Sequence, residues 1–340
     1  MTPLKPRIAI IPGDPSGIGP ELVVKLLHEE GVREAADILL VGDAHVWRQG
    51  AGQAGLDLDL GPVELGEDQV GTHPGLGWLP LDTIAPQEVC IAQVTEAGGR
   101  SSLRCLDKAL DLAMADKVDG ILFGPFNKAA LTAAGMDAED EHRYMARYLG
   151  HEGYHGELNV LDELMTTRVT SHIGLRDVAG NITPEGVENA IGLAEDTLKR
   201  AGKTRPRIAV AALNPHAGDN GKFGREEIDI LAPVIRSAQE RQKDVTGPWP
   251  SDTVFLKAIR GEVDAVVTMY HDQGQIAIKL LGFERGVTVA GGLPVPVTTP
   301  AHGTAFDIAG QNIANVGATR QAFDLLVRMA TTHRAQRAAA

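Results

Sequence analysis

Short apolar runs alternate along the chain with longer segments in which apolar residues recur every three or four positions. The runs are rich in β-branched residues and bounded by turn residues, which is typical of buried strands. We predict strands at residues 7–12, 37–42, 118–124, 207–213 and 263–269. The segments between them predict helices at residues 19–30, 101–115, 128–134, 184–202 and 225–242. The Gly- and Pro-rich segment 53–87 predicts irregular structure or a β-ribbon.

The alternation of strands and helices predicts an α/β fold with mostly parallel sheets covered by helices. A length of 340 residues suggests two domains. We expect a first α/β/α lobe formed by residues 1–135 together with 303–340. Residues 136–302 are expected to form the second lobe, with a cleft between the two.

Composition narrows the classes of function. The chain has 32 basic and 45 acidic residues, a net charge of −13, and so lacks the basic footprint of a nucleic-acid binder. Its two cysteines are too few for a disulfide framework or a cysteine-based zinc site. No run reaches the ~18 apolar residues of a membrane span, and no signal segment stands at the N-terminus. We expect a cytoplasmic protein with neither nucleic-acid nor membrane partners.

Polar motifs follow the predicted strands at 7–12, 118–124, 207–213 and 263–269 directly. Ligands of open α/β sheets gather at the carboxyl ends of strands, so these motifs are expected to converge on one site. The turn at residues 13–21 opens a helix and contains Gly13, Asp14 and Gly17. It offers backbone N–H groups to an anion, but its glycines do not match the dinucleotide fingerprint. The alternative is a tight strand-to-helix connection.

Three histidines stand in similar places. His172 ends the run 164–171, and His216 and His271 each follow a strand by two or three residues. Three imidazoles at strand ends can bind a divalent ion such as Zn²⁺, Co²⁺ or Ni²⁺, with Asp272 or a carbonyl fixing a tautomer. Taken singly, each is more often a hydrogen-bonded loop residue. The residues by themselves leave these two interpretations evenly balanced.

Four other positions each carry two interpretations. Lys128 is a solvated helix start or a substrate clamp, and Asp252 is a helix N-cap or an acid/base group. Lys279 is a solvated side chain on a helix or a substrate contact. The pair His302 and Gly303 precedes a predicted helix, as a plain helix start or as a close approach of backbone to ligand.

The motifs in this order resemble the family of 4-hydroxythreonine-4-phosphate dehydrogenase, an enzyme of pyridoxal phosphate biosynthesis. The resemblance runs from residues 13–21 to 302–305 and includes 170–172, 213–218, 252–255 and 269–274. It implies that a divalent metal is ligated by His172, His216 and His271, without distinguishing Zn, Co, Ni or Mg. It also implies a homodimer with its active site at the subunit interface. The implied fold is similar to isopropylmalate and isocitrate dehydrogenases, in which NAD(P) binds without the usual fingerprint.

The implied reaction is the oxidation of a 3-hydroxy acid with hydride transfer to NAD or NADP, followed by loss of CO2 from the β-keto acid. Lys128 and Asp252 are the candidates for the base that takes the hydroxyl proton. We assign cofactor binding to Gly13, Asp14, Gly17, Asn214, His302 and Gly303.

The chain departs from the family pattern at the substrate. The family's Gly-His-Thr-Glu is replaced by residues 140–143, which place His142 one position out of register. His142 and Arg143 then either contact a substrate carboxylate or form an ordinary helix face. The Asn and Arg that contact the phosphate are replaced by Thr288 and Val297, so Lys279 alone remains. Valine cannot replace the planar fork of a guanidinium.

We therefore expect a paralogue that acts on another hydroxy acid, either without a phosphate or a different sugar acid. One alternative is a cis-dihydrodiol carboxylate dehydrogenase of aromatic acid catabolism. From another enzyme class, the alternative is an acyl- or phosphotransferase on a similar scaffold. NAD(P) binding would discriminate against the transferase.

Overall fold

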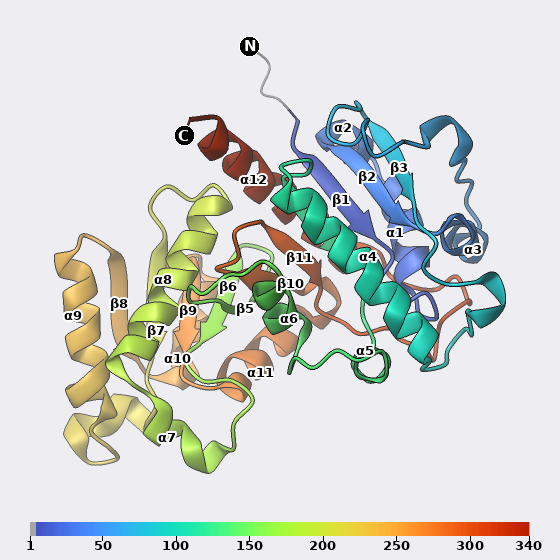
Figure 1. Ribbon diagram of the computed structural model, residues 1–340. Coiled ribbons are helices and arrows are strands. Elements are labelled where there is room, and N and C mark those ends of the chain that lie inside the picture. The colour runs from blue at the N-terminus through green and yellow to red at the C-terminus, as the bar shows by residue number, and fades with distance from the viewer. Residues whose placement is uncertain (1–4, 340) are drawn as a thin grey trace. The chain divides into compact units, whose positions relative to one another are not determined.

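The computed structural model describes residues 5–339 and divides the chain into two compact units. Unit 1 comprises Met1–Glu152 and Leu293–Ala340, and unit 2 is the continuous segment Gly153–Gly292. Each unit is a sheet covered by helices, as Figure 1 shows, so the α/β class predicted from the sequence is confirmed. No helix among residues 5–339 combines the length and the apolar character needed to cross a membrane.

The divisions fall at 152/153 and 292/293, in place of the expected 135/136 and 302/303. Helix α6 (Glu141–Tyr148) belongs to unit 1 because its tyrosines bind helix α4 (Glu96–Met114). The hydroxyl of Tyr144 donates to Asp107 Oδ1 at 2.7 Å, and that of Tyr148 donates to Asp111 Oδ1 at 2.9 Å. Strand β11 belongs to unit 1 because it pairs with β4.

Unit 1 contains a parallel five-stranded sheet in the order β3-β2-β1-β4-β11. The strands are β1 (Arg7–Ile11), β2 (Asp37–Gly42), β3 (Leu76–Pro80), β4 (Gly120–Phe123) and β11 (Val297–Pro300). The other helices of the unit are α1 (Gly19–His28), α2 (Val32–Ala35), α3 (Ala44–Ala54), α5 (Lys128–Ala133) and α12 (Gly317–Ala339), with 3₁₀ turns at Gly61–Val63 and Pro86–Glu88. Helix α4 lies in front of the strands in Figure 1 and packs against β1, β2 and β4. The strands are almost wholly buried, which explains their continuous apolar sequences.

Unit 2 contains a mixed sheet in the order β10-β5-β6-β9-β7-β8. The pairs β10–β5 and β5–β6 are antiparallel, and the remaining pairs are parallel. The strands are β5 (Gly156–Leu161), β6 (Leu164–Arg168), β7 (Arg207–Ala211), β8 (Asp244–Trp249), β9 (Ala265–Thr268) and β10 (Val287–Gly291). The helices are α7 (Val178–Asn181), α8 (Pro184–Arg200), α9 (Ala232–Glu240), α10 (Ser251–Ile259) and α11 (His271–Gly282), with short turns at Leu175–Asp177, Pro215–Gly221, Glu227–Leu231 and Phe283–Arg285.

All five predicted strands are confirmed, but two local predictions are corrected. Most of the segment 53–87 is irregular, as one of its two interpretations predicted, but it is not a β-ribbon, because β3 pairs in parallel with β2 and extends the sheet of unit 1. The helix predicted at 225–242 is split into a π-turn (Glu227–Leu231) and α9. Pro233 stands at the start of α9 and has no N–H to continue the preceding turn.

Candidate metal and cofactor sites

Two of the three predicted metal ligands lie together in unit 2. His172 and His271 follow the neighbouring parallel strands β6 and β9. The ladder continues beyond both strands, because the N–H and the hydroxyl of Thr170 donate to the Met269 carbonyl at 3.1 and 2.7 Å. The ring centroids of the two histidines are 5.8 Å apart. The register of the sheet therefore brings these imidazoles to one place.

The tautomer of the neutral His271 ring is set by its neighbour. His271 Nδ1 lies 2.7 Å from Asp272 Oδ1, and a carboxylate oxygen can only accept. Nδ1 therefore carries the proton of a neutral ring, and Nε2 keeps its lone pair for a metal. Of the two partners that the sequence suggested, the structure selects Asp272 for this histidine.

His216 lies on a left-handed turn. The segment Pro215–Gly221 has positive φ angles from His216, at 53°, through Asn220, at 55°. Left-handed backbone costs about 1–2 kcal/mol for each residue that carries a Cβ. Such strain persists only where surrounding contacts hold it, and it gathers at functional sites.

A buried carboxylate holds this turn. Glu227 Oε1 accepts hydrogen bonds from the N–H groups of Leu213 and Asn214 at 2.9 and 2.8 Å. Its Oε2 accepts from Asn214 Nδ2 at 3.0 Å, and a Cβ added to Gly218 would stand 2.7 Å from the same oxygen. Sequence analysis missed Glu227, because an acidic residue in a helical pattern normally signals a solvated face. Asn214, predicted to bind the cofactor, is a partner of this carboxylate in unit 2.

The donor set of unit 2 fits a borderline divalent ion. Imidazole nitrogens are ligands of Zn²⁺, Co²⁺ and Ni²⁺, and one of these rings already has its carboxylate partner. Among the described residues of unit 2, no three such ligand atoms all lie within 4.8 Å of one another. The structure thus pairs His172 with His271 and places His216 on its own strained turn.

The glycine turn of unit 1 is a tight connection between β1 and α1. Two of its backbone donors have acceptors elsewhere in unit 1: the Asp14 N–H donates to the Pro125 carbonyl at 3.0 Å, and the Ile18 N–H donates to the Thr304 carbonyl at 3.1 Å. A Cβ on Gly17 would stand 2.9 Å from that Thr304 oxygen. These contacts join the turn to the segment around Thr304, and a role of Gly13, Asp14 and Gly17 in cofactor binding stays a prediction.

Among the predicted cofactor residues, His302 and Gly303 in unit 1 and Asn214 in unit 2 are not buried. Gly303 is exposed, and His302 is half-buried with Nδ1 at 3.1 Å from the Gly303 carbonyl oxygen. Burial lowers the pKa of His302, which favours the neutral ring. Gly13, Asp14 and Gly17 are buried and shape the site by packing. The sequence predicted a helix directly after this segment, but the next helix along the chain is α12, which begins at Gly317.

The buried carboxyl of Asp14 predicts a pH dependence of stability. Burial raises its pKa from 3.8 to about 6, and hydrogen bonds from Ser16 offset part of that rise. The folded state therefore holds the proton more tightly than the unfolded state, and stability falls as the pH rises from about 4 to 6. We expect Asp14→Asn to raise the free energy of unfolding above pH 6 by up to about 3 kcal/mol, with a far smaller gain near pH 4. Urea unfolding at pH 4.5 and 7.5 measures this difference, and an equal gain at both pH values would contradict it.

The two candidates for the base lie at the starts of helices. Lys128 is the first residue of α5 and is exposed, directly after Asn127, whose Oδ1 accepts from the Ala130 N–H at 3.0 Å. Asp252 is exposed in the first turn of α10, whose N-cap is Pro250. The N-cap interpretation of Asp252 is therefore wrong, since the helix begins earlier.

The substrate-binding candidates divide between the units. In unit 1, α6 is capped by Asp140, which accepts from the Arg143 N–H at 2.8 Å. The Arg143 guanidinium is paired with Glu139, and His142 is on the buried side of the helix. A contact of His142 or Arg143 with a substrate carboxylate stays a prediction. In unit 2, Lys279 is exposed on α11 and Thr288 lies half-buried on β10.

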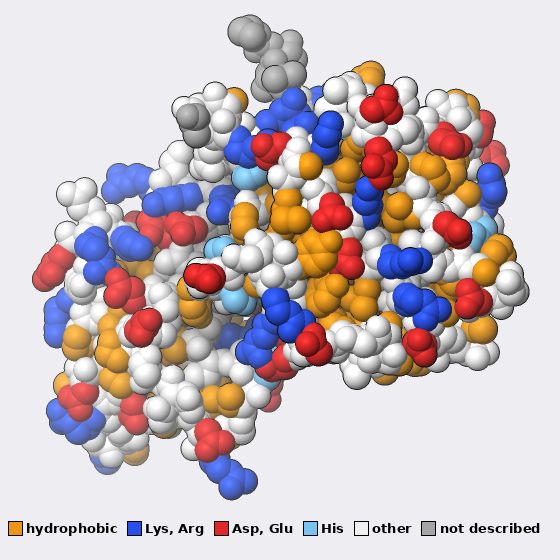
Figure 2. All heavy atoms as spheres, in the orientation of Figure 1, with side chains coloured by type: hydrophobic (Ala, Val, Ile, Leu, Met, Phe, Trp, Pro, Cys, Tyr) orange, Lys and Arg blue, Asp and Glu red, His pale blue; other side chains and the backbone are white. Residues whose placement is uncertain are grey.

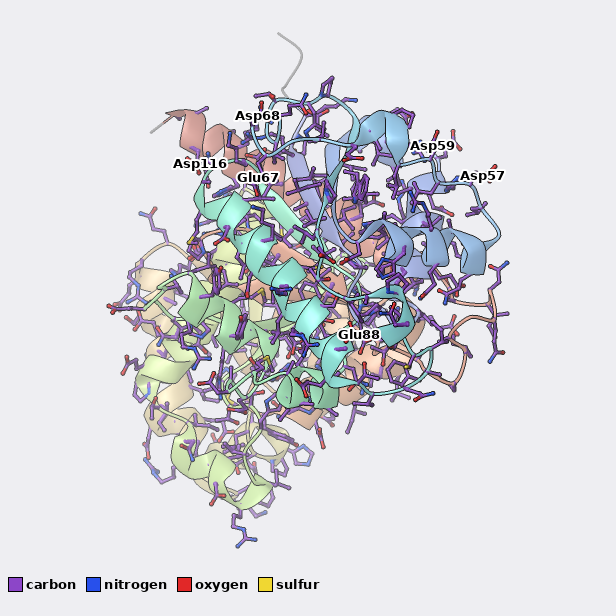
Figure 3. The ribbon with its side chains drawn as sticks, turned by 45° about the vertical axis from the view of Figure 1, so that its right-hand side comes forward. Asp57, Asp59, Glu67, Asp68, Glu88 and Asp116 are labelled. Carbon is purple, nitrogen blue, oxygen red and sulfur yellow. The ribbon has the colours of Figure 1, made fainter. Side chains whose placement is uncertain are left out.

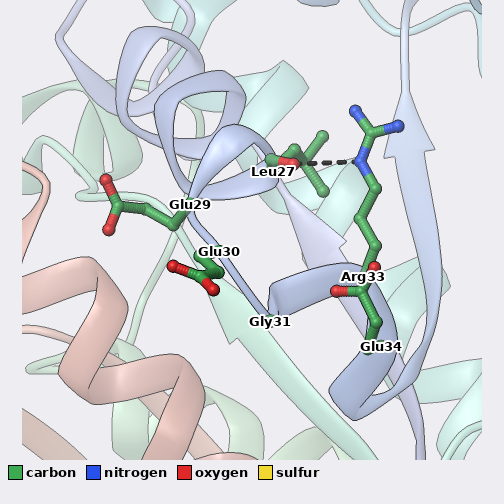
Figure 4. A pocket seen from close by; sticks show the side chains of 6 residues that line it. All are labelled: Leu27, Glu29, Glu30, Gly31, Arg33 and Glu34. Carbon is green, nitrogen blue, oxygen red and sulfur yellow. Dashed lines mark hydrogen bonds between the residues drawn. The ribbon is translucent and has the colours of Figure 1, made fainter.

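Many acidic groups of unit 1 lie at the surface, whereas Glu21, Asp43 and Asp119 are buried. Figure 2 shows acidic and basic side chains intermixed over one face, and Figure 3 labels six acidic residues on the loops of this unit. Ion pairs join Glu67 to Lys108 and Asp116 to Arg337. A depression of about 420 Å³ at the turn between α1 and α2 is shown in Figure 4 and contains none of the predicted residues. It is lined by Leu27, Glu29, Glu30, Gly31, Arg33 and Glu34.

Comparison with known proteins identifies relatives over nearly the whole chain. The family model "Pyridoxal phosphate biosynthetic protein PdxA" matches residues 34–326. A Pseudomonas aeruginosa protein, provisionally named 4-hydroxythreonine-4-phosphate dehydrogenase 2, is 51% identical over 96% of this chain and 98% of its own. The D-threonate 4-phosphate dehydrogenase of Salmonella typhimurium is 41% identical over 89% of this chain and 92% of its own.

Solved structures of similar proteins also match nearly the whole chain. The 4-hydroxythreonine-4-phosphate dehydrogenase of Klebsiella pneumoniae superposes with a TM-score of 0.84 at 35% identity, covering 97% of this chain and 100% of that one. A terephthalate 1,2-cis-dihydrodiol dehydrogenase of Burkholderia xenovorans LB400 gives 0.66 at 29% identity, covering 95% and 98%. An isocitrate dehydrogenase of Methylococcus capsulatus gives 0.50 at 17% identity, covering 98% and 89%, a likeness of fold alone. The chain belongs to the PdxA family of pyridoxal phosphate biosynthetic proteins.

Proposed function

We propose that this protein is a metal- and NAD(P)-dependent dehydrogenase that oxidises the hydroxyl of a 3-hydroxy acid and then releases CO2. The observation that carries the proposal is the pair His172 and His271, at the ends of adjacent strands with ring centroids 5.8 Å apart. Membership in a family whose compared members are named as dehydrogenases supports it. The same membership argues against the acyl- or phosphotransferase alternative.

The metal would be held by His172, His216 and His271. When bound, it would supply Lewis-acid stabilisation of the negative charge that develops on substrate oxygen. Asp272 would keep the proton of the neutral His271 ring on Nδ1, which leaves the lone pair of Nε2 available to a metal. We propose Lys128 as the group that accepts the hydroxyl proton, with Asp252 as the second candidate.

We propose that NAD or NADP binds to unit 1 at His302 and Gly303. The exposed Gly303 has no atom within 4 Å of the position of a Cβ, which leaves room for a close approach to its backbone. The neutral ring of His302 can donate or accept a hydrogen bond without adding charge. The buried glycine turn below supports this segment through the Ile18–Thr304 hydrogen bond.

We propose a phosphorylated hydroxy acid as the substrate, since both curated relatives are named for one. We assign the contact with the substrate phosphate to Lys279, which is exposed on α11 in unit 2. A second candidate is a dihydrodiol carboxylate. Two observations favour it: Val297 stands where the family's phosphate-binding arginine is expected, and a dihydrodiol dehydrogenase shares the fold at 29% identity.

The test is NADH or NADPH formation by protein loaded with each of Zn²⁺, Co²⁺, Ni²⁺ and Mg²⁺. The substrates are 4-hydroxythreonine 4-phosphate, D-threonate 4-phosphate, their unphosphorylated counterparts and a dihydrodiol carboxylate. We expect turnover on the order of 1 s⁻¹ or faster with a phosphorylated acid. Activity confined to unphosphorylated acids would select the second candidate, and full activity after chelation of all metal would refute the metal dependence.

We also propose a homodimer with the active site at the subunit interface. Helix α11 exposes Ile276 and Leu280, which are 60% and 83% accessible and one helical turn apart. Large apolar side chains exposed at this spacing are typical of a surface that another chain covers. A monomer in sedimentation velocity at micromolar concentration would contradict the proposal. The cytoplasmic location remains a prediction from the sequence.

A further inference from the structure

Arg168, the last residue of β6, is buried, and each of its three side-chain nitrogens donates a hydrogen bond. Its Nε donates to Ser171 Oγ at 2.9 Å, Nη1 donates to Asn159 Oδ1 at 3.0 Å, and Nη2 donates to Glu157 Oε2 at 2.9 Å. The guanidinium fork thus fixes three groups in one plane, which a flexible ammonium cannot do. Nothing in the proposed reaction uses this side chain directly.

The network reaches both paired histidines. Ser171 directly precedes His172, whose φ of 54° is in the left-handed region that a residue with a side chain seldom adopts. On the other side, Asn159 Oδ1 also accepts from Gln275 Nε2 at 2.5 Å. Gln275 stands one helical turn after His271 on α11. Arg168 therefore joins the turn that carries one histidine to the helix that carries the other.

We propose that Arg168 is a positioning residue that sets the spacing between His172 and His271. The proposal rests on the metal site of the proposed function. A metal ion requires its ligand nitrogens at about 2.0–2.1 Å, so the two rings must be held to within a fraction of an ångström. Partners behind the ligands commonly change metal affinity by 10–100-fold.

Two mild substitutions cut the network without removing the buried charge. Ser171→Ala removes the acceptor of Arg168 Nε beside His172, and Gln275→Ala removes the donor to Asn159 on the helix of His271. Both side chains are half-buried, so we expect both variants to fold. Binding is measured as Co²⁺ titration followed by visible absorption, with no substrate present. We expect each variant to bind Co²⁺ about tenfold more weakly, and Ser171→Thr, which keeps the hydroxyl, to restore the affinity.

The matched control is another arginine–carboxylate pair in the same sheet. Arg207 donates to both oxygens of Asp264 at 3.0 and 2.9 Å, at the amino ends of β7 and β9, opposite to the histidines. Arg207→Met is expected to lower the melting temperature without changing the Co²⁺ affinity. A similar loss of affinity in this variant would show that the effect is general destabilisation and would overturn the proposal.

The failure of this inference is distinct from failure of the metal site. If the wild type binds Co²⁺ and His271→Ala does not, while Ser171→Ala and Gln275→Ala bind as tightly as the wild type, the positioning role is refuted and the metal site stands. If His271→Ala binds Co²⁺ as the wild type does, the metal site is refuted and the positioning role falls with it.

Discussion

His271→Ala is expected to lower kcat/KM by about 10³-fold or more, because loss of a ligand removes several kcal/mol of charge stabilisation. The fold should survive, since the side chain of His271 is 39% exposed at the start of α11. The measurements are NAD(P)H formation with the best substrate of the panel, Co²⁺ titration and the melting temperature.

The control is His28→Ala. This histidine is the last residue of α1 in unit 1, and its Nδ1 lies 2.9 Å from the Val24 carbonyl oxygen. It belongs to none of the proposed sites, so its loss should leave turnover and Co²⁺ affinity unchanged. Equal activity of His271→Ala and the wild type, with the metal content of both confirmed, would contradict the assignment of His271 as a ligand.

Glu227→Ala is expected to cost about 3 kcal/mol of folding free energy and to weaken metal binding. Removal of its carboxylate leaves the N–H groups of Leu213 and Asn214 without their acceptor, at about 1–3 kcal/mol for each buried donor. The left-handed turn from His216 onward then loses the contact that holds it and can relax to ordinary backbone. Urea unfolding gives the first effect, and Co²⁺ titration gives the second.

Glu226→Ala separates this role from a general effect of charge. Glu226 is the neighbouring carboxylate, is half-buried, and accepts a hydrogen bond from the Asn214 side chain at 2.7 Å. We expect it to cost less than 1 kcal/mol, in line with a partly exposed hydrogen bond. Equal losses in the two variants would show that the backbone contacts of Glu227 are not what holds the turn.

The sequence determined the fold class and most of the parallel strands. The runs at 7–12, 37–42, 118–124, 207–213 and 263–269 are mainly apolar, with a charged residue only at the first or second position, because parallel strands are buried on both faces and no water-facing side interrupts the pattern. The N-cap of α8 was also predictable from the sequence: Thr183 Oγ1 accepts a hydrogen bond from the Gly186 N–H at 3.0 Å. These features depend on neighbours in sequence and on burial alone.

The strands of unit 2 that contain polar residues could not be predicted from an apolar pattern. Strands β5, β6 and β10 carry Glu157, Asn159, Arg168 and Thr288, which interrupt the apolar pattern. These groups are tolerated inside because they hydrogen-bond to one another across strands, as Asn159 Nδ2 does to Thr288 Oγ1 at 3.4 Å. The hydrogen-bonded partners are up to 129 residues apart in the chain, so no local sequence pattern predicts these contacts.

The same distinction between local sequence pattern and long-range contact applies to the candidate site. The sequence alone identified the types of ligand, three histidines after strands, and the resemblance that gives them a function. Only the tertiary structure decided that parallel register pairs His172 with His271, that Asp272 selects the tautomer, and that Glu227 holds the turn of His216. The physical reason is that ligand types are chosen by local chemistry, whereas their spacing is set by hydrogen bonds between residues that are distant in the chain. Arg168 and Glu227, ordinary charged residues in the sequence, acquire their roles only through those contacts.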